Sequence, residues 1–200
     1  MDRNSTEKST NEILITGFGG QGIVLAGQVL GMAASLIDHK ESTLTQSYGP
    51  EARGGACSAQ VIISDSLIHY PYVRNPDILV CMSQAGYDKY GGLLKEGGVL
   101  LYDQDMVRSP ETVADSFPIP ATRMAEELGR KMMANIVMLG FVTATTGAAS
   151  HEAMLKAVSD SVPSGTEAAN AAAFNKGYEF GMAVLKARRK KAAVTREAAS

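Results

Sequence analysis

The sequence predicts a three-layer α/β domain with a mixed, mainly parallel sheet. Short apolar runs typical of buried strands alternate along the chain with longer segments of helical periodicity, and two of the strand-like runs are close enough to form one β-hairpin. The 200 residues, 45% of them hydrophobic, suffice to bury the core of one such domain. A helical part is expected to follow the sheet toward the carboxyl end.

The first half of the chain supplies a strand, a helix and the hairpin. An apolar run that starts at residue 12 leads into glycines at 17–22, and helical periodicity then continues to about Asp38. After a stretch rich in glycine come two strand-like runs, 56–64 and 66–73, which are joined by a short polar turn. This spacing predicts the β-hairpin.

The second half begins as a β-α-β unit and ends in helices. Two apolar runs typical of buried strands flank an amphipathic segment at 84–97, an order expected of parallel strands joined by a crossover helix. These runs occupy residues 77–83 and 98–104. Most of the remaining chain has helical periodicity, at residues 122–147, 150–162 and 168–186.

Both ends are expected to extend beyond the domain at 13–185. Residues 1–12 are polar and rich in Ser and Thr, which predicts a disordered N-terminal extension. Residues 186–200 form a basic tail that keeps high helix propensity. Two interpretations of this tail stay open: a solvated helix end whose cations suit the helix dipole, or a segment that docks on a partner.

Composition excludes several classes of partner and location. The formal net charge of −2 gives no basic field that would point to nucleic acid, and no apolar run is long enough to span a membrane. The first twelve residues lack the apolar core of a signal peptide. The two cysteines, Cys57 and Cys81, have neither metal-ligand nor disulfide-framework spacing, so we expect buried thiols in a soluble, cytoplasmic protein.

A glycine motif follows the first predicted strand and opens the first helix. Its residues are Gly17, Phe18, Gly19, Gly20, Gln21 and Gly22. Such a turn allows a phosphate to approach backbone N–H groups at the positive end of the helix dipole. A Rossmann-like dinucleotide site would also need a second strand that ends in an acidic residue about 20 residues on, but the helix continues to Asp38. Two roles stay open: binding a phosphorylated ligand, or close strand–helix packing.

A second motif lies in a loop with a fixed kink. The stretch "TQSYGPEARGG" combines Pro50 and three glycines with one carboxylate and one guanidinium, so it cannot form a regular helix. Its candidate functional residues are Tyr48, Glu51, Arg53, Gly54 and Gly55. The composition predicts a shaped loop that holds a ligand or another polypeptide.

Four segments together resemble a known family. They are "ITGFGGQGIVLAGQVL", "TQSYGPEARGGACSAQVIIS", "PDILVCMSQAGYDKY" and "ANIVMLGFVTA". In this order they are similar to the gamma subunits of 2-oxoacid:ferredoxin oxidoreductases, in detail most to those that act on 2-oxoglutarate. The resemblance covers most of residues 13–185, and the pair GGQG and YGPExRGG is far more specific than either motif alone.

The resemblance implies a subunit of a larger oxidoreductase. The complete enzyme of this family contains alpha, beta and gamma parts, and in many members a delta part. It converts 2-oxoglutarate, coenzyme A and oxidised ferredoxin to succinyl-CoA, CO₂ and reduced ferredoxin. By the same resemblance, partner subunits carry thiamine diphosphate, Mg²⁺ and iron–sulfur clusters, whereas the gamma part helps hold coenzyme A and assemble the complex.

The resemblance also gives the two motifs expected roles. The glycine motif is the first candidate contact for coenzyme A, whose phosphates suit a glycine turn at a helix N-terminus. The second motif is expected where the gamma part meets the catalytic core. For Arg53 two roles compete: binding an anion of coenzyme A, or a structural ion pair with Glu51.

The sequence contains no catalytic residue that we can assign. It has neither a thiamine-binding signature nor a cysteine cluster, so the isolated chain is expected to be inactive. The histidines His39, His69 and His151 are scattered without ligand spacing. Asn135 lies in an apolar helix, where a buried amide that caps a neighbouring backbone group is expected. The alternative function is a free-standing nucleotide-binding or regulatory α/β domain, which leaves the second motif unexplained.

Overall fold

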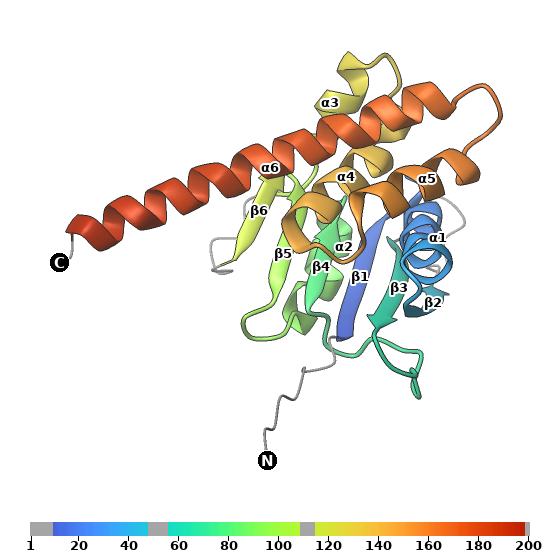
Figure 1. The fold of residues 1–200 in the computed structure, drawn as a ribbon, viewed down its shortest axis with the longest axis horizontal. Coiled ribbons are helices and arrows are strands. Elements are labelled where there is room, and N and C mark those ends of the chain that lie inside the picture. Colours follow the sequence, from blue (N-terminus) through green and yellow to red (C-terminus); the bar gives the residue numbers. More distant parts are fainter. Residues whose placement is uncertain (1–9, 48–55, 109–114, 199–200) are drawn as a thin grey trace.

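The computed structural model describes residues 10–47, 56–108 and 115–198. Within them a six-stranded sheet is covered on both faces, which confirms the predicted α/β fold (Figure 1). The strands lie in the order β2-β3-β1-β4-β5-β6. Their bounds are β1 Thr10–Phe18, β2 Glu41–Ser47, β3 Ala56–Ser64, β4 Ile78–Cys81, β5 Val99–Asp103 and β6 Ser116–Ile119.

The sheet is mixed, as predicted. Strands β1, β4, β5 and β6 run parallel to one another, and β3 pairs antiparallel with both β1 and β2. Strand β1 begins at Thr10, before the predicted start of the ordered domain at residue 13. Its first residues are tied down by pairing with β3 and by a hydrogen bond from the Glu12 N–H to Asp77 (2.8 Å).

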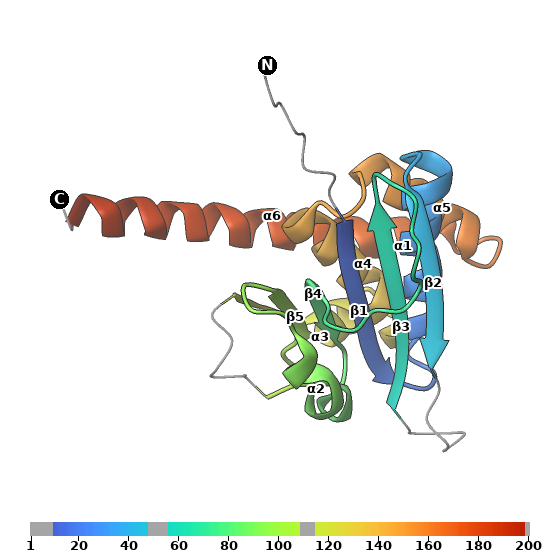
Figure 2. The same ribbon diagram turned by 90° about the horizontal axis from the view of Figure 1, so that it is seen from below.

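The predicted position of the hairpin is wrong. The partner of β3 is β2, at residues 41–47, whereas the run 66–73 forms no strand. Because β1 and β2 occupy both sides of β3, no pairing edge is left for residues 66–73. That segment instead crosses the sheet, where the Val73 N–H donates to Gln60 Oε1 (2.9 Å) (Figure 2). Strand β2 was missed because an edge strand tolerates polar residues.

The helices form one thick layer and one thin layer. Helices α1, α4, α5 and α6 cover one face, α3 packs on α4, and α2 lies on the other face (Figures 1 and 2). The helix bounds are α1 Ile23–Met32, α2 Gln84–Tyr90, α3 Ala121–Glu127, α4 Ala134–Thr146, α5 His151–Ser161 and α6 Glu167–Ala198. A π-helical turn, η1 (Ala33–Ile37), extends α1, and short 3₁₀ turns, η2 (Gly91–Leu93) and η3 (Lys131–Met133), follow α2 and precede α4.

Alternate residues of β1 pack into two separate hydrophobic cores, one on each face of the sheet. Ile13 and Ile15 belong to the large core beneath α1 and α4, whereas Leu14 joins a smaller cluster with Tyr90 of α2. A strand buried on both faces needs apolar residues at every position, which explains the continuous apolar run in the sequence. Both cysteines are buried free thiols, and burial raises the pKa of each.

Helices α4 and α6 pack with their backbones in close approach. Ten of the thirteen residues of α4 are buried, so this helix lies inside the domain. A Cβ at Gly140 would overlap the Phe174 carbonyl oxygen of α6, and one at Gly177 would overlap the Val137 carbonyl oxygen of α4. Only glycine allows this separation.

Helix α6 continues well beyond the sheet. It runs without a break to Ala198, and its far end stands clear of β6 (Figures 1 and 2). The first part of the basic tail is nevertheless attached, because the Arg188 guanidinium lies 3.6 Å from the centre of the Phe117 ring and donates to the Ser116 carbonyl. Arg188 is therefore not part of a solvated helix end. Among the described residues, no helix is both long and apolar enough to cross a lipid bilayer.

The glycine contact predicts a specific stability loss. Gly177→Ala should lower the free energy of unfolding by about 1–3 kcal/mol, since overpacking against the α4 backbone outweighs the higher helix propensity of alanine. Gly92→Ala is the matched control, because its Cβ would meet nothing within 4 Å. Urea denaturation of the isolated chain measures both. Equal stability of the two variants would contradict the close packing.

Candidate functional site

The glycine motif lies at the point where two neighbouring strands connect to helices on opposite faces of the sheet. Strand β1 leads to α1 on one face, and the neighbouring strand β4 leads to α2 on the other. In open α/β sheets such a switch point leaves a crevice beyond the carboxyl ends of the two strands. Gln21 spans it, since its Nε2–H donates to the Met82 carbonyl (3.0 Å) while its Oε1 accepts from the Phe18 N–H (2.6 Å). Its side-chain amide is thus used within the fold.

Two glycines of the motif serve packing. A Cβ at Gly17 would overlap the Gln21 Oε1 atom, and one at Gly22 would overlap the Asn135 side-chain amide. Gly22 also has a φ of 71°, in the left-handed region that disfavours other residues. The packing role that the sequence left open therefore applies to these two positions.

The middle glycines face outward. Gly19 and Gly20 are exposed, and among the described residues a Cβ at either would meet nothing within 4 Å. Gly20 has a φ of 96°, whereas Gly19 has no such constraint. Phe18, just before them, is partly buried. Only Gly19 and Gly20 thus present bare backbone to a ligand.

Helix α1 begins beside these glycines without a side-chain cap. Gly22 is its N-cap, and no side chain accepts a hydrogen bond from the first turn. The Asn135 Nδ2–H donates to the Gly22 carbonyl (3.1 Å), and Asn135 Oδ1 accepts from the Ile136 N–H (3.0 Å). The predicted role of Asn135 as a buried amide that caps backbone groups is confirmed. The uncapped N–H groups carry the positive end of the helix dipole.

Two cavities open on either side of the segment that precedes α4. Gly20, Lys131 and Met132 line both, and Met132 is 83% exposed. The larger, about 370 Å³, has a mostly apolar wall. Its other lining residues are Gly22, Leu25, Arg130, Met133, Asn135, Ile136, Val162, Pro163, Thr166 and Asn170. The smaller, about 250 Å³, is completed by Gln21, Met106, Thr122 and Ala134.

Two cations bring positive charge to the larger cavity. Arg130 and Lys131 are exposed, and Lys131 pairs with Glu126 (3.2 Å). Gly129, with a φ of 83°, ends α3 and turns the chain toward them. The sequence interpretation treated this region as mostly helix and missed the turn. A glycine that follows a helical run is a usual C-terminal stop signal, and Gly129 could have revealed the turn.

Asp103, at the carboxyl end of β5, holds the start of α3. Its buried carboxylate accepts hydrogen bonds from the N–H (3.0 Å) and hydroxyl (2.6 Å) of Thr122 and from the Asp105 N–H (3.1 Å). Burial raises the pKa of this carboxyl, and the hydrogen bonds oppose the rise. Because α3 has no side-chain cap within its own first turn, Asp103 anchors the helix that leads to Arg130 and Lys131.

The second motif lies outside the described residues. This applies to Tyr48, Glu51, Arg53, Gly54 and Gly55. The described flanks of that loop belong to β2 and β3, and Ala56 is paired with Phe18 at the end of β1. The loop therefore starts and ends at the same edge of the sheet as the glycine motif.

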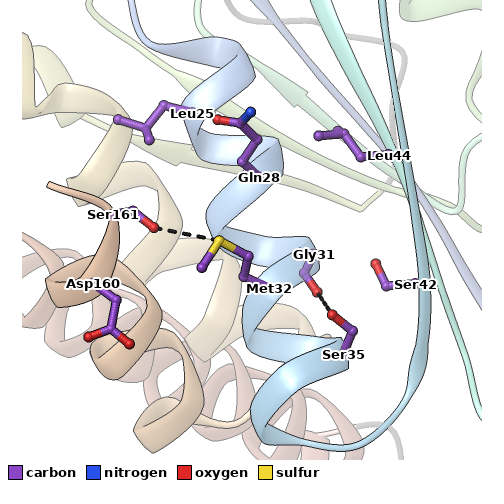
Figure 3. Close-up of a pocket in the computed structure, with 9 residues that line it drawn as sticks. All are labelled: Leu25, Gln28, Gly31, Met32, Ser35, Ser42, Leu44, Asp160 and Ser161. Atoms are coloured by element: carbon purple, nitrogen blue, oxygen red, sulfur yellow. Dashed lines mark hydrogen bonds between the residues drawn. The ribbon is translucent and has the colours of Figure 1, made fainter.

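Another groove has different chemistry. It lies between α1, β2 and the end of α5 and measures about 560 Å³ (Figure 3). Its polar wall includes Gln28, Ser35, Ser42 and Asp160, and none of the described residues that line it is cationic. These described residues offer an anion no positive partner, whereas Arg130 and Lys131 line the cavity beside the glycine motif.

The described part of the chain offers no metal centre. Within it, no three His, Cys, Asp or Glu side chains are grouped to hold an ion. His151 packs edge-on against Tyr178 and its Nε2 lies 3.1 Å from Asn175 Oδ1, which is a structural role. The glycine site combines exposed backbone, two cations and an apolar wall, and none of its described residues forms a catalytic acid–base or nucleophilic arrangement.

Comparison with known proteins identifies relatives across most of the chain. The family model of pyruvate ferredoxin/flavodoxin oxidoreductase matches residues 12–180. The chain is 56% identical to the 2-oxoglutarate synthase subunit KorC of Methanocaldococcus jannaschii, over 86% of this chain and 94% of that one. It is 51% identical to the same subunit of Methanothermobacter thermautotrophicus, over 84% and 94%.

Solved structures of two other proteins have a fold similar to that of this chain. The gamma subunit of a keto/oxoacid ferredoxin oxidoreductase from Geobacter sulfurreducens has a TM-score of 0.80 at 40% identity, covering 88% of this chain and 98% of that chain. The 2-oxoglutarate:ferredoxin oxidoreductase of Magnetococcus marinus, solved with coenzyme A and succinyl-CoA, has the same TM-score at 23% identity, over 88% and 32%. This second likeness shows the fold alone. The predicted resemblance to gamma subunits is confirmed, and the chain belongs to the pyruvate ferredoxin/flavodoxin oxidoreductase family.

Proposed function

We propose that this chain is the gamma subunit of a 2-oxoglutarate:ferredoxin oxidoreductase. The complex converts 2-oxoglutarate, coenzyme A and oxidised ferredoxin to succinyl-CoA, CO₂ and reduced ferredoxin. The observation that carries this proposal is the 56% identity to a 2-oxoglutarate synthase subunit over 94% of that subunit's length. Relatives named for other 2-oxoacids are more distant: a pyruvate synthase subunit at 35% and a ketoisovalerate oxidoreductase subunit at 37% identity.

The proposal assigns the redox chemistry to partner subunits. These are an alpha and a beta subunit, joined by a delta subunit in many members of the family, and they would carry thiamine diphosphate, Mg²⁺ and iron–sulfur clusters. Those groups supply decarboxylation and electron transfer when bound. The chain's two cysteines, both buried, support this division because a cluster needs more thiolates. Their free thiols also agree with a reducing cytoplasm as the location.

The residues of the glycine site fit part of coenzyme A. Its phosphates require N–H donors and cations, which the Gly19–Gly20 backbone, the uncapped start of α1, Arg130 and Lys131 would supply. Its pantetheine arm is apolar with amide groups and matches the apolar wall of the larger cavity. In this role the chain binds and orients the acyl acceptor and excludes water from one side of it. The second motif, with Tyr48, Glu51, Arg53, Gly54 and Gly55, would complete the contact with the catalytic core.

The division of labour predicts an inactive isolated chain. Expressed alone, it should show no 2-oxoglutarate-dependent reduction of a viologen dye. Anaerobic co-expression with the alpha and beta subunits should yield a complex that has this activity and requires coenzyme A. Activity of the pure chain, or failure to co-purify with those subunits, would overturn the proposed function.

The open backbone at Gly19 predicts a selective binding defect. Gly19→Val should leave the melting temperature of the chain unchanged, since a Cβ there would meet no atom of the described residues within 4 Å. In the assembled enzyme it should raise the KM for coenzyme A roughly tenfold, with a near-normal KM for 2-oxoglutarate. Gly92→Val, equally open but outside the site, is the matched control. An unchanged KM for coenzyme A would leave the motif with a packing role only.

The cations predict a phosphate-specific effect. Arg130→Gln and Lys131→Gln should each raise the KM for coenzyme A several-fold, because a charge-assisted contact is lost. If the contact is to the 3′-phosphate, neither variant should change the KM for 3′-dephospho-coenzyme A. Lys156→Gln, an exposed cation of α5, is the control. Equal losses with both forms of the coenzyme would place the cations at the pyrophosphate, whereas no loss with either would exclude them from the site.

A further inference from the structure

The end of α6 carries a concentration of positive charge on an exposed helix. The chain has 19 lysines and arginines and 21 acidic residues. Residues 186–200 contain six of the lysines and arginines but only one of the acidic residues. The first 185 residues are left with thirteen cations and twenty acids, so the two parts have opposite net charge. Residues 189–198, here called the cationic arm, span about 15 Å of helix.

The arm stands away from the domain in a fixed direction. Figure 1 shows α6 extending past β6, Figure 2 shows the end of α6 clear of the other labelled elements, and residues 189–194 are all exposed. At its base Arg188 stacks on Phe117, bonds to the Ser116 carbonyl and lies 3.7 Å from Asp115. These contacts anchor the base of the arm to β6 and to the residue before it.

The helix dipole does not account for the position of these cations. Favourable interaction with the dipole is limited to the last turn of a helix, which here contains Glu197. Lys186, Arg189 and Lys190 lie earlier and share one face at spacings of three and four residues. Like charges at this spacing destabilise a helix by a few tenths of a kcal/mol per pair. A surface of opposite charge would relieve that repulsion.

The composition of the arm favours a protein as its occupant. Its only large apolar residue is Val194, so it lacks the wide apolar face that a membrane-surface helix inserts into lipid. The acidic remainder of the chain would repel the polyanionic backbone of nucleic acid. A protein with a local cluster of carboxylates can reach the arm without approaching the acidic domain.

We infer that the cationic arm docks on a carboxylate-rich surface of a partner subunit of the same enzyme complex. This inference rests on the proposed function for the existence of that partner. Arg188 is a positioning residue that sets the direction of the arm, and Arg189 and Lys190 make the contacts. The arm would thereby attach the gamma domain at a distance from the coenzyme A cavity.

Charge reversal in the assembled enzyme tests the arm. The double variant Arg189→Glu/Lys190→Glu should bind the partner subunits at least roughly tenfold more weakly at low ionic strength, and the difference should shrink as salt screens the charges. Arg189→Lys/Lys190→Arg keeps both charges and should bind normally. Affinity is measured by titrating labelled chain into the remaining subunits under anaerobic conditions. The melting temperature and helical circular dichroism of each free variant control for folding.

Several results would overturn the inference. Unchanged affinity and salt dependence of the reversed variant would show that the arm has no partner in the complex. Normal assembly of the reversed variant with slower ferredoxin reduction would show that the arm binds the electron acceptor. Tight binding of the wild-type chain to duplex DNA or to anionic vesicles at physiological salt would show that the partner of the arm is a nucleic acid or a membrane. The proposed function is tested separately by the substrate requirement of the wild-type complex. A complex that assembles through the arm but uses another 2-oxoacid would reject that function and keep the docking role.

Discussion

The close backbone contact between α4 and α6 is the constraint on which the rest of the structure depends. Gly140 and Gly177 allow the two helices to approach until main-chain atoms touch, and α4 becomes a buried central helix. Its first turn then reaches the start of α1, where Asn135 bonds to Gly22. The cavity beside the glycine motif exists because these three helices meet there. Packing far from the ligand surface thus sets the shape of the candidate site.

Some residues of the glycine motif stabilise the fold, and others are open to a ligand. Gly17 and Gly22 are needed because neighbouring side chains occupy the space of a Cβ, and Gln21 holds the turn to the end of β4. Gly19 and Gly20 have no such neighbours. In the proposed function, these two present the backbone to coenzyme A, the substrate that enzymes for different 2-oxoacids share. This agrees with the occurrence of similar chains in relatives named for pyruvate and ketoisovalerate.

Sequence reasoning predicted the buried elements well and the exposed ones poorly. Strands β1, β3, β4 and β5 were recognisable because burial on both faces demands apolar runs. Strands β2 and β6 were missed, since the edges of a sheet tolerate polar residues and short strands. The glycine motif was located correctly, but the cations that face it, Arg130 and Lys131, come from a distant turn. Their proximity depends on tertiary packing, which local patterns do not encode.

Helix α6 links two distant parts of the molecule. Near one end, Asn170 lines the cavity beside the glycine motif, and about 30 Å along the same helix stands Lys190 in the cationic arm. The helix is uninterrupted over this length, and its close backbone contact with α4 at Gly177 lies between these two residues. The two regions therefore cannot move independently unless the helix between them bends. One continuous helix thus joins the cationic arm to the wall of the candidate site.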